Sequence, residues 1–177
     1  MPIKNKDQRV AIFIDVQNLY HSAKNLFSAR VNFREILKTA TAGRQLIRAL
    51  AYVVRTKTGE EKPFFDALLN LGIETREKDL QEYYGGLKKA DWDVGIAVDA
   101  IKTSGSVDVV VLISGDGDYV PLVEYLKNHG KRVEALAFGK STSTKLRESV
   151  DEFIDLSEES GKYLLKNSRW PGIKIIK

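Results

Sequence analysis

Residues 107–118 read VDVVVLISGDGD. Apart from Asp108, the first seven are apolar and rich in β-branched side chains, which is typical of a strand buried on both faces of a sheet. A polar turn with Asp116 and Asp118 follows, and a helix is predicted from about Tyr119 to His129, where Gly130 ends it. A buried strand that passes through a short turn into a helix is the repeating unit of an α/β fold.

The rest of the chain repeats this alternation. Further strands are predicted at residues 10–14, 50–54, 73–80, 132–138 and 153–156. Helices are predicted at residues 63–71, 94–101 and 143–150, and a closing helix at residues 157–166. Strands that alternate with helices predict a mostly parallel central sheet covered on both faces.

Length and composition fit one domain with a tail. The 177 residues are 43% hydrophobic, which is enough for one substantial core and too little for two full domains. The formal net charge of +4 permits a polyanionic partner without requiring one. The chain has no cysteine, so oxygen ligands are expected at any metal site. No signal peptide or membrane span is recognisable, and a cytoplasmic protein is expected.

Acidic residues follow two of the predicted buried strands. Asp15 and Asp116 both stand at the ends of such strands, Asp118 lies two residues further on, and Asp93 begins the preceding helix. Ligands of open parallel sheets bind beyond the carboxyl ends of the strands, so we expect these side chains to converge. Carboxylates gathered in one cleft repel each other unless a cation neutralises them. The pattern therefore favours bound Mg²⁺ or Mn²⁺ and hydrolysis of a phosphodiester.

Several of these aspartates have a structural alternative. Asp15 could cap a helix after its strand, and Asp118 could cap the helix that begins at Tyr119. Asp99 lies inside an apolar helix, where an unpaired carboxylate is costly. It either faces the site or pairs with a base such as Lys102.

Polar and basic residues near the predicted cleft are candidates for supporting roles. The amide of Asn18 could orient Asp15 or a phosphate, and Ser114 could form the turn or donate a hydrogen bond to the site. Nucleic-acid phosphates could be bound by basic residues that could equally be solvated surface, namely Lys88, Lys89, Lys140, Lys145 and Arg147.

Three elements resemble, in this order, the motifs of NYN domains of the LabA-like group. They are residues 14–18 (IDVQN), residues 89–94 (KADWDV) with Asp99, and residues 114–123 (SGDGDYVPLV). The third element is the most specific. The likeness covers about Val10 to Leu156, so the expected division is a domain at residues 1–156 and a C-terminal helix and tail at residues 157–177.

NYN domains are similar to PIN and FLAP nucleases. The resemblance therefore implies a three-layer α/β/α, Rossmann-like domain with an acidic site for Mg²⁺ or Mn²⁺ that acts on RNA. It implies catalytic and metal-binding roles for Asp15, Asp93, Asp116 and Asp118, with Asp99 adjoining the metal and Asn18 and Ser114 in support. Where the family often has Lys-Gly-x-Asp, this chain has Lys89-Ala90-Asp91-Trp92-Asp93, which leaves open whether Asp91 or Asp93 faces the metal.

The expected function is that of a metal-dependent ribonuclease. One alternative is an RNA-binding or regulatory module with weak catalysis. Another is a small-molecule phosphohydrolase, although the haloacid dehalogenase pattern requires a second Asp where Gln17 stands. RNA is the expected partner, no membrane contact is expected, and assembly into a homodimer is left open.

Overall fold

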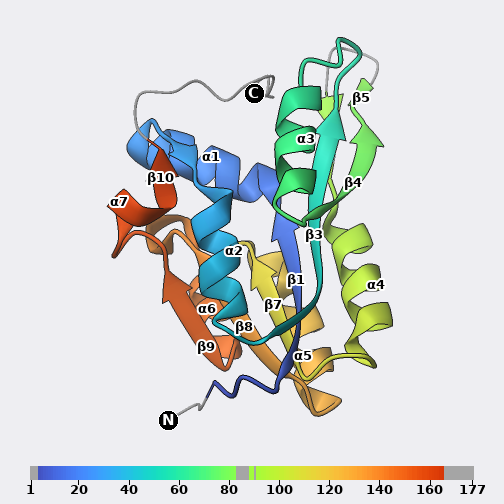
Figure 1. Cartoon of the computed structure of the whole chain (residues 1–177), viewed down its shortest axis with the longest axis vertical. Helices are drawn as coiled ribbons and strands as arrows, with labels where there is room; N and C mark the ends of the chain where they lie inside the picture. Colours follow the sequence, from blue (N-terminus) through green and yellow to red (C-terminus); the bar gives the residue numbers. More distant parts are fainter. Residues whose placement is uncertain (1–3, 83–87, 90, 166–177) are drawn as a thin grey trace.

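A computed structural model of the chain describes residues 4–82, 88–89 and 91–165. Its centre is a six-stranded sheet in which each strand is parallel to its neighbours (Figure 1). The strands run across the sheet in the order β4 (Glu74–Asp79), β3 (Gln45–Arg55), β1 (Arg9–Asp15), β7 (Val109–Ile113), β8 (Arg132–Ala137) and β9 (Glu152–Asp155). The parallel sheet predicted from the apolar runs is confirmed.

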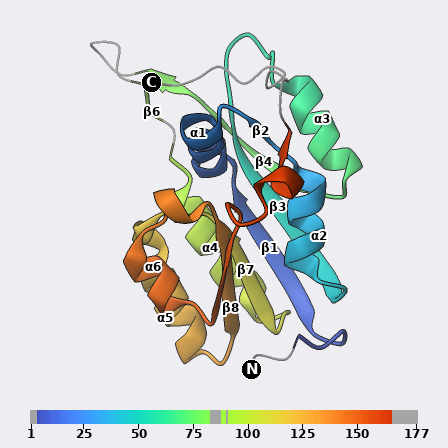
Figure 2. The same cartoon turned by 90° about the vertical axis from the view of Figure 1, so that its left-hand side faces the viewer.

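Helices cover both faces of the sheet, as Figure 2 shows most clearly. One face is packed by α1 (Val16–Phe27), α2 (Phe33–Thr41) and α3 (Lys62–Asn70). The other face is packed by α4 (Asp93–Ser104), α5 (Val120–Asn128) and α6 (Thr144–Ser149). The molecule therefore has the three-layer α/β/α architecture that the resemblance implies.

Strand β1 supplies side chains to both hydrophobic cores. Val10, Ile12 and Ile14 belong to the core under α1, α2 and α3, whereas Ala11 and Phe13 belong to the core on the α4 side. Successive residues of a strand point to opposite faces, so a strand buried on both sides must be apolar throughout. This is why residues 10–14 form one continuous apolar run.

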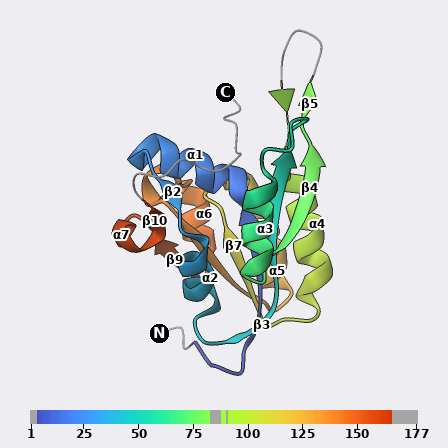
Figure 3. The ribbon, with the colours of Figure 1, turned by 45° about the horizontal axis from the view of Figure 1, so that its top comes forward.

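The C-terminal part of the described chain packs on the domain. Helix α7 (Ser160–Tyr163) is shorter than the helix predicted at residues 157–166, and it leads into β10 (Leu164–Leu165), which pairs antiparallel with β2 (Arg30–Val31) (Figure 3). Tyr163 and Leu164 are buried in the hydrophobic core. The remaining predicted tail, residues 166–177, lies outside the described residues. In the described part of the chain, no helix is long and apolar enough to cross a membrane.

The register of the central strands places the predicted site residues at one edge. Ile14 of β1 pairs with Ile113 of β7, so the next residues, Asp15 and Ser114, follow neighbouring strands at the same level. Helix α1 begins directly after Asp15. The carboxyl edge of the sheet, near its middle, is thus where the acidic residues come together.

Candidate metal centre

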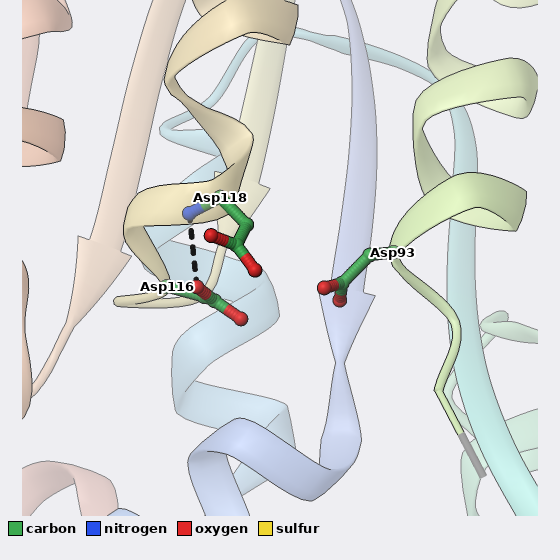
Figure 4. Close-up of side chains that lie close together, drawn as sticks. All are labelled: Asp93, Asp116 and Asp118. Atoms are coloured by element: carbon green, nitrogen blue, oxygen red, sulfur yellow. Dashed lines mark hydrogen bonds between the residues drawn. The ribbon is translucent and has the colours of Figure 1, made fainter.

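Three carboxylates converge beyond the carboxyl end of β1. Asp93, Asp116 and Asp118 each offer one oxygen, and these oxygens lie within 4.8 Å of one another. Asp93 is the first residue of α4, Asp116 follows β7, and Asp118 lies in the short 3-10 helix η1 (Gly117–Tyr119). Figure 4 shows Asp93 reaching from α4 toward the other two. We call these three residues the acidic cluster.

The turn after β7 is held by hydrogen bonds from its own polar side chains. Asp116 Oδ1 accepts from the backbone N–H of Asp118 at 2.9 Å and so caps η1 (Figure 4). The N–H of Asp116 in turn donates to Ser114 Oγ at 3.2 Å. The residue that caps a helix in this turn is therefore Asp116 and not Asp118. The cap uses only Oδ1 of Asp116, so Oδ2 is left for a ligand.

Asp15 lines the same pocket as the three residues of the acidic cluster. Its Oδ1 accepts from the N–H of Asn18 at 3.2 Å and caps α1, and its Oδ2 accepts from Ser114 Oγ at 3.1 Å. The hydroxyl of Tyr119 lies 3.3 Å from Asp15 Oδ2 and 3.0 Å from Asp93 Oδ1. A tyrosine has one hydroxyl proton, so Tyr119 links the two carboxylates by sharing it between them.

Asn18 supports the turn after β7. Its side-chain Oδ1 accepts from the N–H of Gly115 at 2.9 Å, which ties the first turn of α1 to that turn. Ser114, fully buried, bonds both Asp15 and Asp116. The structure thus brings both predicted supporting residues to the site.

Asp91 and Asp93 have different roles. Asp91 Oδ1 accepts from the backbone N–H of Asp93 at 2.8 Å and orders the start of α4. Asp93 belongs to the acidic cluster. Both residues line the pocket of the acidic cluster, and the carboxylate of Asp93 is the one that lies close to those of Asp116 and Asp118.

Asp99 does not join the acidic cluster, contrary to the expectation. It accepts a hydrogen bond from the hydroxyl of Tyr52 at 2.8 Å and lies 3.6 Å from Arg76 Nε. Asp99 follows Asp93 by six positions on α4, and at about 100° per residue the two side chains leave the helix on different sides. Asp99 therefore faces β3 and β4, and its base is Arg76 rather than Lys102.

The glycines of the SGDGD turn permit close packing of the segment that follows β8. A Cβ on Gly115 would lie 2.7 Å from Thr142 Oγ1, and one on Gly117 would lie 2.7 Å from Ser143 Oγ. The N–H of Ser143 donates to the carbonyl of Gly115 at 2.9 Å. These contacts bring the Ser/Thr-rich segment beside the turn of the acidic cluster.

The predicted phosphate-binding residues differ in their surroundings. Lys140 and Lys145 are exposed on this Ser/Thr-rich segment and the start of α6. Arg147 instead pairs with Asp155 at 3.2 Å and lies over the ring of Phe153, so much of its charge is already engaged. The side chains of the predicted pair Lys88 and Lys89 lie outside the described residues.

Without a bound ion, burial and the repulsion between neighbouring carboxylates raise the pKa values of Asp15 and Asp93. Burial raises the pKa of Asp15 to about 6, against the opposing effect of its hydrogen bonds from Asn18, Ser114 and Tyr119. Burial, a hydrogen bond with Asp91 and the charges of Asp91 and Asp116 raise the pKa of Asp93 to about 7. A bound cation would favour the charged carboxylates and lower their pKa values again. The set of oxygen donors therefore fits a hard divalent ion.

These shifts predict that the metal-free protein loses stability as the pH rises. The pKa of Asp15 is about 6 when folded and near its ordinary value when unfolded, so the folded state holds more protons between about pH 4 and 6. The contribution of Asp15 to the free energy of unfolding should therefore fall across this range, and that of Asp93, whose pKa is about 7, should go on falling to about pH 7. Asp15→Asn should flatten the curve by up to about 3 kcal/mol, measured by urea unfolding in EDTA at several pH values. A variant curve as steep as that of the wild type would contradict this.

Sequence reasoning missed Tyr119 and Gln17. Tyr119 is almost fully buried, and its position next to Asp118 gave it the appearance of a core residue at a helix start. Gln17 lines the pocket of the acidic cluster together with Asn18. The pairing of Tyr119 with two carboxylates depends on how α4 and η1 pack, which local sequence does not reveal.

Comparisons with known proteins agree with this geometry. The NYN domain family model matches residues 9–158. The low amplitude and bright protein LabA of Synechococcus elongatus is 26% identical over 162 residues, which cover 86% of each chain. An uncharacterized protein of Methanocaldococcus jannaschii is 24% identical over 158 residues, which cover 86% of this chain and 57% of that protein.

A solved structure has the same fold. The protein of unknown function VPA0982 from Vibrio parahaemolyticus superposes with a TM-score of 0.83 and 30% identity, covering 92% of this chain and 99% of that chain. Since the family model spans most of the chain, the chain belongs to the NYN domain family.

Proposed function

We propose that this protein is a divalent-metal-dependent ribonuclease that hydrolyses phosphodiester bonds of RNA at the acidic cluster. The observation that carries the proposal is the convergence of three carboxylate oxygens within 4.8 Å at the carboxyl edge of a parallel sheet. Membership of a nuclease-like family supports the same conclusion. Mg²⁺ and Mn²⁺ are the expected ions, because hard cations prefer carboxylate oxygens.

The surroundings of the acidic cluster support a cation rather than a protein base as its neutralising charge. Among the described residues, no Lys or Arg forms an ion pair with Asp93, Asp116 or Asp118. Carboxylates this close repel one another. The raised pKa of Asp93 records part of that cost.

The residues of the site would have separate roles in binding the ion and in positioning its ligands. Asp93, Asp116 and Asp118 would hold the ion, each through one carboxylate oxygen, and Asp118 is the most exposed of the three. Ser114 and Tyr119 keep Asp15 and Asp93 in place through hydrogen bonds. A bound divalent ion supplies a more acidic water and neutralises charge that develops on the phosphate.

RNA phosphates would be held beside the acidic cluster by the exposed Lys140 and Lys145. Their segment packs against the turn that carries Asp116, through the contacts at Gly115 and Gly117. Contacts of this kind bind the backbone of a nucleic acid and leave its sequence unread. We therefore expect binding to weaken as the salt concentration rises.

Cleavage of a labelled single-stranded RNA tests the proposal. The wild type should cut the RNA with Mn²⁺ or Mg²⁺ and stop when EDTA is added. RNA binding that survives EDTA without cleavage under either ion would instead identify an RNA-binding or regulatory module. Turnover of an aryl phosphate without RNA cleavage would identify a phosphohydrolase.

A further inference from the structure

Helix α4 carries a row of apolar side chains on its outer surface. Val94 is 78% exposed, Val98 is 47% exposed and Ile101 is 38% exposed, although all three side chains are aliphatic. Steps of four and three residues place them one above the other on the same side of the helix. Figure 1 shows α4 at the outer margin of the molecule. We call these three residues the α4 strip.

The α4 strip is separate from the sides of α4 that pack within the molecule. Ile96 and Ala100 are buried in the hydrophobic core, and Asp99 faces β3 and β4. Helix α4 is therefore apolar on its outer side as well as its inner side, whereas the outer side of a surface helix is normally polar. A contiguous patch of exposed apolar side chains commonly marks a surface that binds another protein.

Tyr125 of α5 extends this apolar surface. Helix α5 packs against both α4 and α6. Lys127 faces α6, because it pairs with Asp151 at 3.6 Å and donates to the carbonyl of Ser149. Tyr125, which is exposed, lies two positions earlier and thus about 200° around the helix, on the side of α4. It is the sixth residue of α5, as Val98 is of α4, and both helices begin at the carboxyl edge of the sheet.

The charges at the two ends of α4 favour a second copy of this chain as the partner. The N-terminal end is acidic, with Asp91 and the acidic cluster. The C-terminal end carries Lys102, which is exposed and forms no ion pair with another described residue. Antiparallel packing of two α4 helices brings the basic end of each to the acidic end of the other. RNA is a poor occupant, because aliphatic side chains offer no charge or hydrogen bond to a phosphate.

We propose that two copies of this chain pair through their α4 strips, with the helices antiparallel about a twofold axis near Val98. The contact is then the same surface on both copies. Val98 faces Val98 of the second copy, and Val94 packs beside Ile101 of the second copy, since both lie about 5 Å from the axis along the helix. Lys102 of each copy lies level with Val94 of the other, next to Asp93 of the acidic cluster. The inference goes beyond the proposed function and does not depend on it.

The mass of the protein in solution tests the pairing. Light scattering of the wild type at about 100 µM, above the micromolar Kd expected of a small interface, should give twice the mass of one chain. Val98→Glu should give the mass of one chain, because it places two carboxylates at the axis. Leu69→Glu is the matched control: it changes an aliphatic residue of α3 that is 54% exposed on the opposite face of the sheet, and the mass should stay doubled. Thermal unfolding should show that both variants fold.

Cysteine cross-linking tests the alignment of the two helices. The chain has no cysteine, so Val98→Cys introduces a single thiol. Under mild oxidation this variant should form a disulfide-linked dimer, because facing Cα atoms of two packed helices can approach within about 7 Å. Val94→Cys should stay unlinked, because the two copies of this residue would lie about 12 Å apart along the helices.

A wild type with the mass of one chain would overturn the proposal whatever the variants do, and would leave the α4 strip to a different protein. A dimer that persists in folded Val98→Glu would place the interface elsewhere on the molecule. Equal cross-linking of Val94→Cys and Val98→Cys would contradict the antiparallel alignment.

Discussion

Asp116→Asn is expected to reduce metal-dependent RNA cleavage by at least about a hundredfold. Replacing a residue that merely supports a metal ligand commonly costs about 10- to 100-fold, and removal of a charged ligand should cost no less. The amide oxygen of the new side chain could still accept from the N–H of Asp118, so η1 should keep its cap. The loss should therefore reflect the metal site and not unfolding.

The measurement is the initial rate of RNA cleavage in Mn²⁺ for both proteins, purified in parallel. Asp66→Asn removes an exposed carboxylate of α3 and serves as the matched control, with a rate expected to equal that of the wild type. Thermal unfolding in EDTA should show that all three proteins fold. Equal cleavage by wild type and Asp116→Asn would assign the activity to a contaminant.

The largest effect on stability is expected at a buried ion pair far from the acidic cluster. Arg44 and Glu134 have side chains that are 0% and 1% exposed, and two hydrogen bonds of 2.9 and 2.8 Å join them. Arg44 also donates to the carbonyls of Ala40 and Thr41, and Arg132 donates to Glu134. The network fastens the turn between α2 and β3 to β8.

Glu134→Leu is expected to lower the free energy of unfolding by about 3–5 kcal/mol, because it leaves the buried Arg44 charge without a carboxylate. Arg44→Met should cost less, since Glu134 keeps Arg132. The double variant should recover much of the loss, because two apolar side chains of similar volume replace the pair. Urea unfolding at pH 7 measures all three. Additive losses in the double variant would show that the two charges do not stabilise each other.

Much of the fold could be predicted because the central parallel strands β1 and β7 are apolar on both faces. The runs at residues 10–14 and 107–113 indicated β1 and β7 directly. Helices α1 and α2 were not assigned, although Val16, Leu19, Tyr20 and Ala23 have helical spacing and are buried. Strand β10 could not be foreseen, because a two-residue strand is created by its pairing with β2 and not by a local pattern.

Site residues that directly follow a strand or begin a helix could be predicted, whereas the direction of a side chain inside a helix could not. Asp116 and Ser114 lie close to each other in sequence and in space. Asp99 has a plausible sequence position but faces Tyr52 and Arg76, because the rotation of α4 turns it away.

The central claim is that one cation is shared by Asp93, Asp116 and Asp118. Anomalous diffraction from crystals soaked in Mn²⁺ tests it most directly. We expect a manganese peak about 2.0–2.3 Å from carboxylate oxygens of Asp93 and Asp116, close to Asp118, and no such peak in Asp116→Asn crystals. Manganese bound only elsewhere, with the three carboxylates unliganded at saturating Mn²⁺, would contradict the claim.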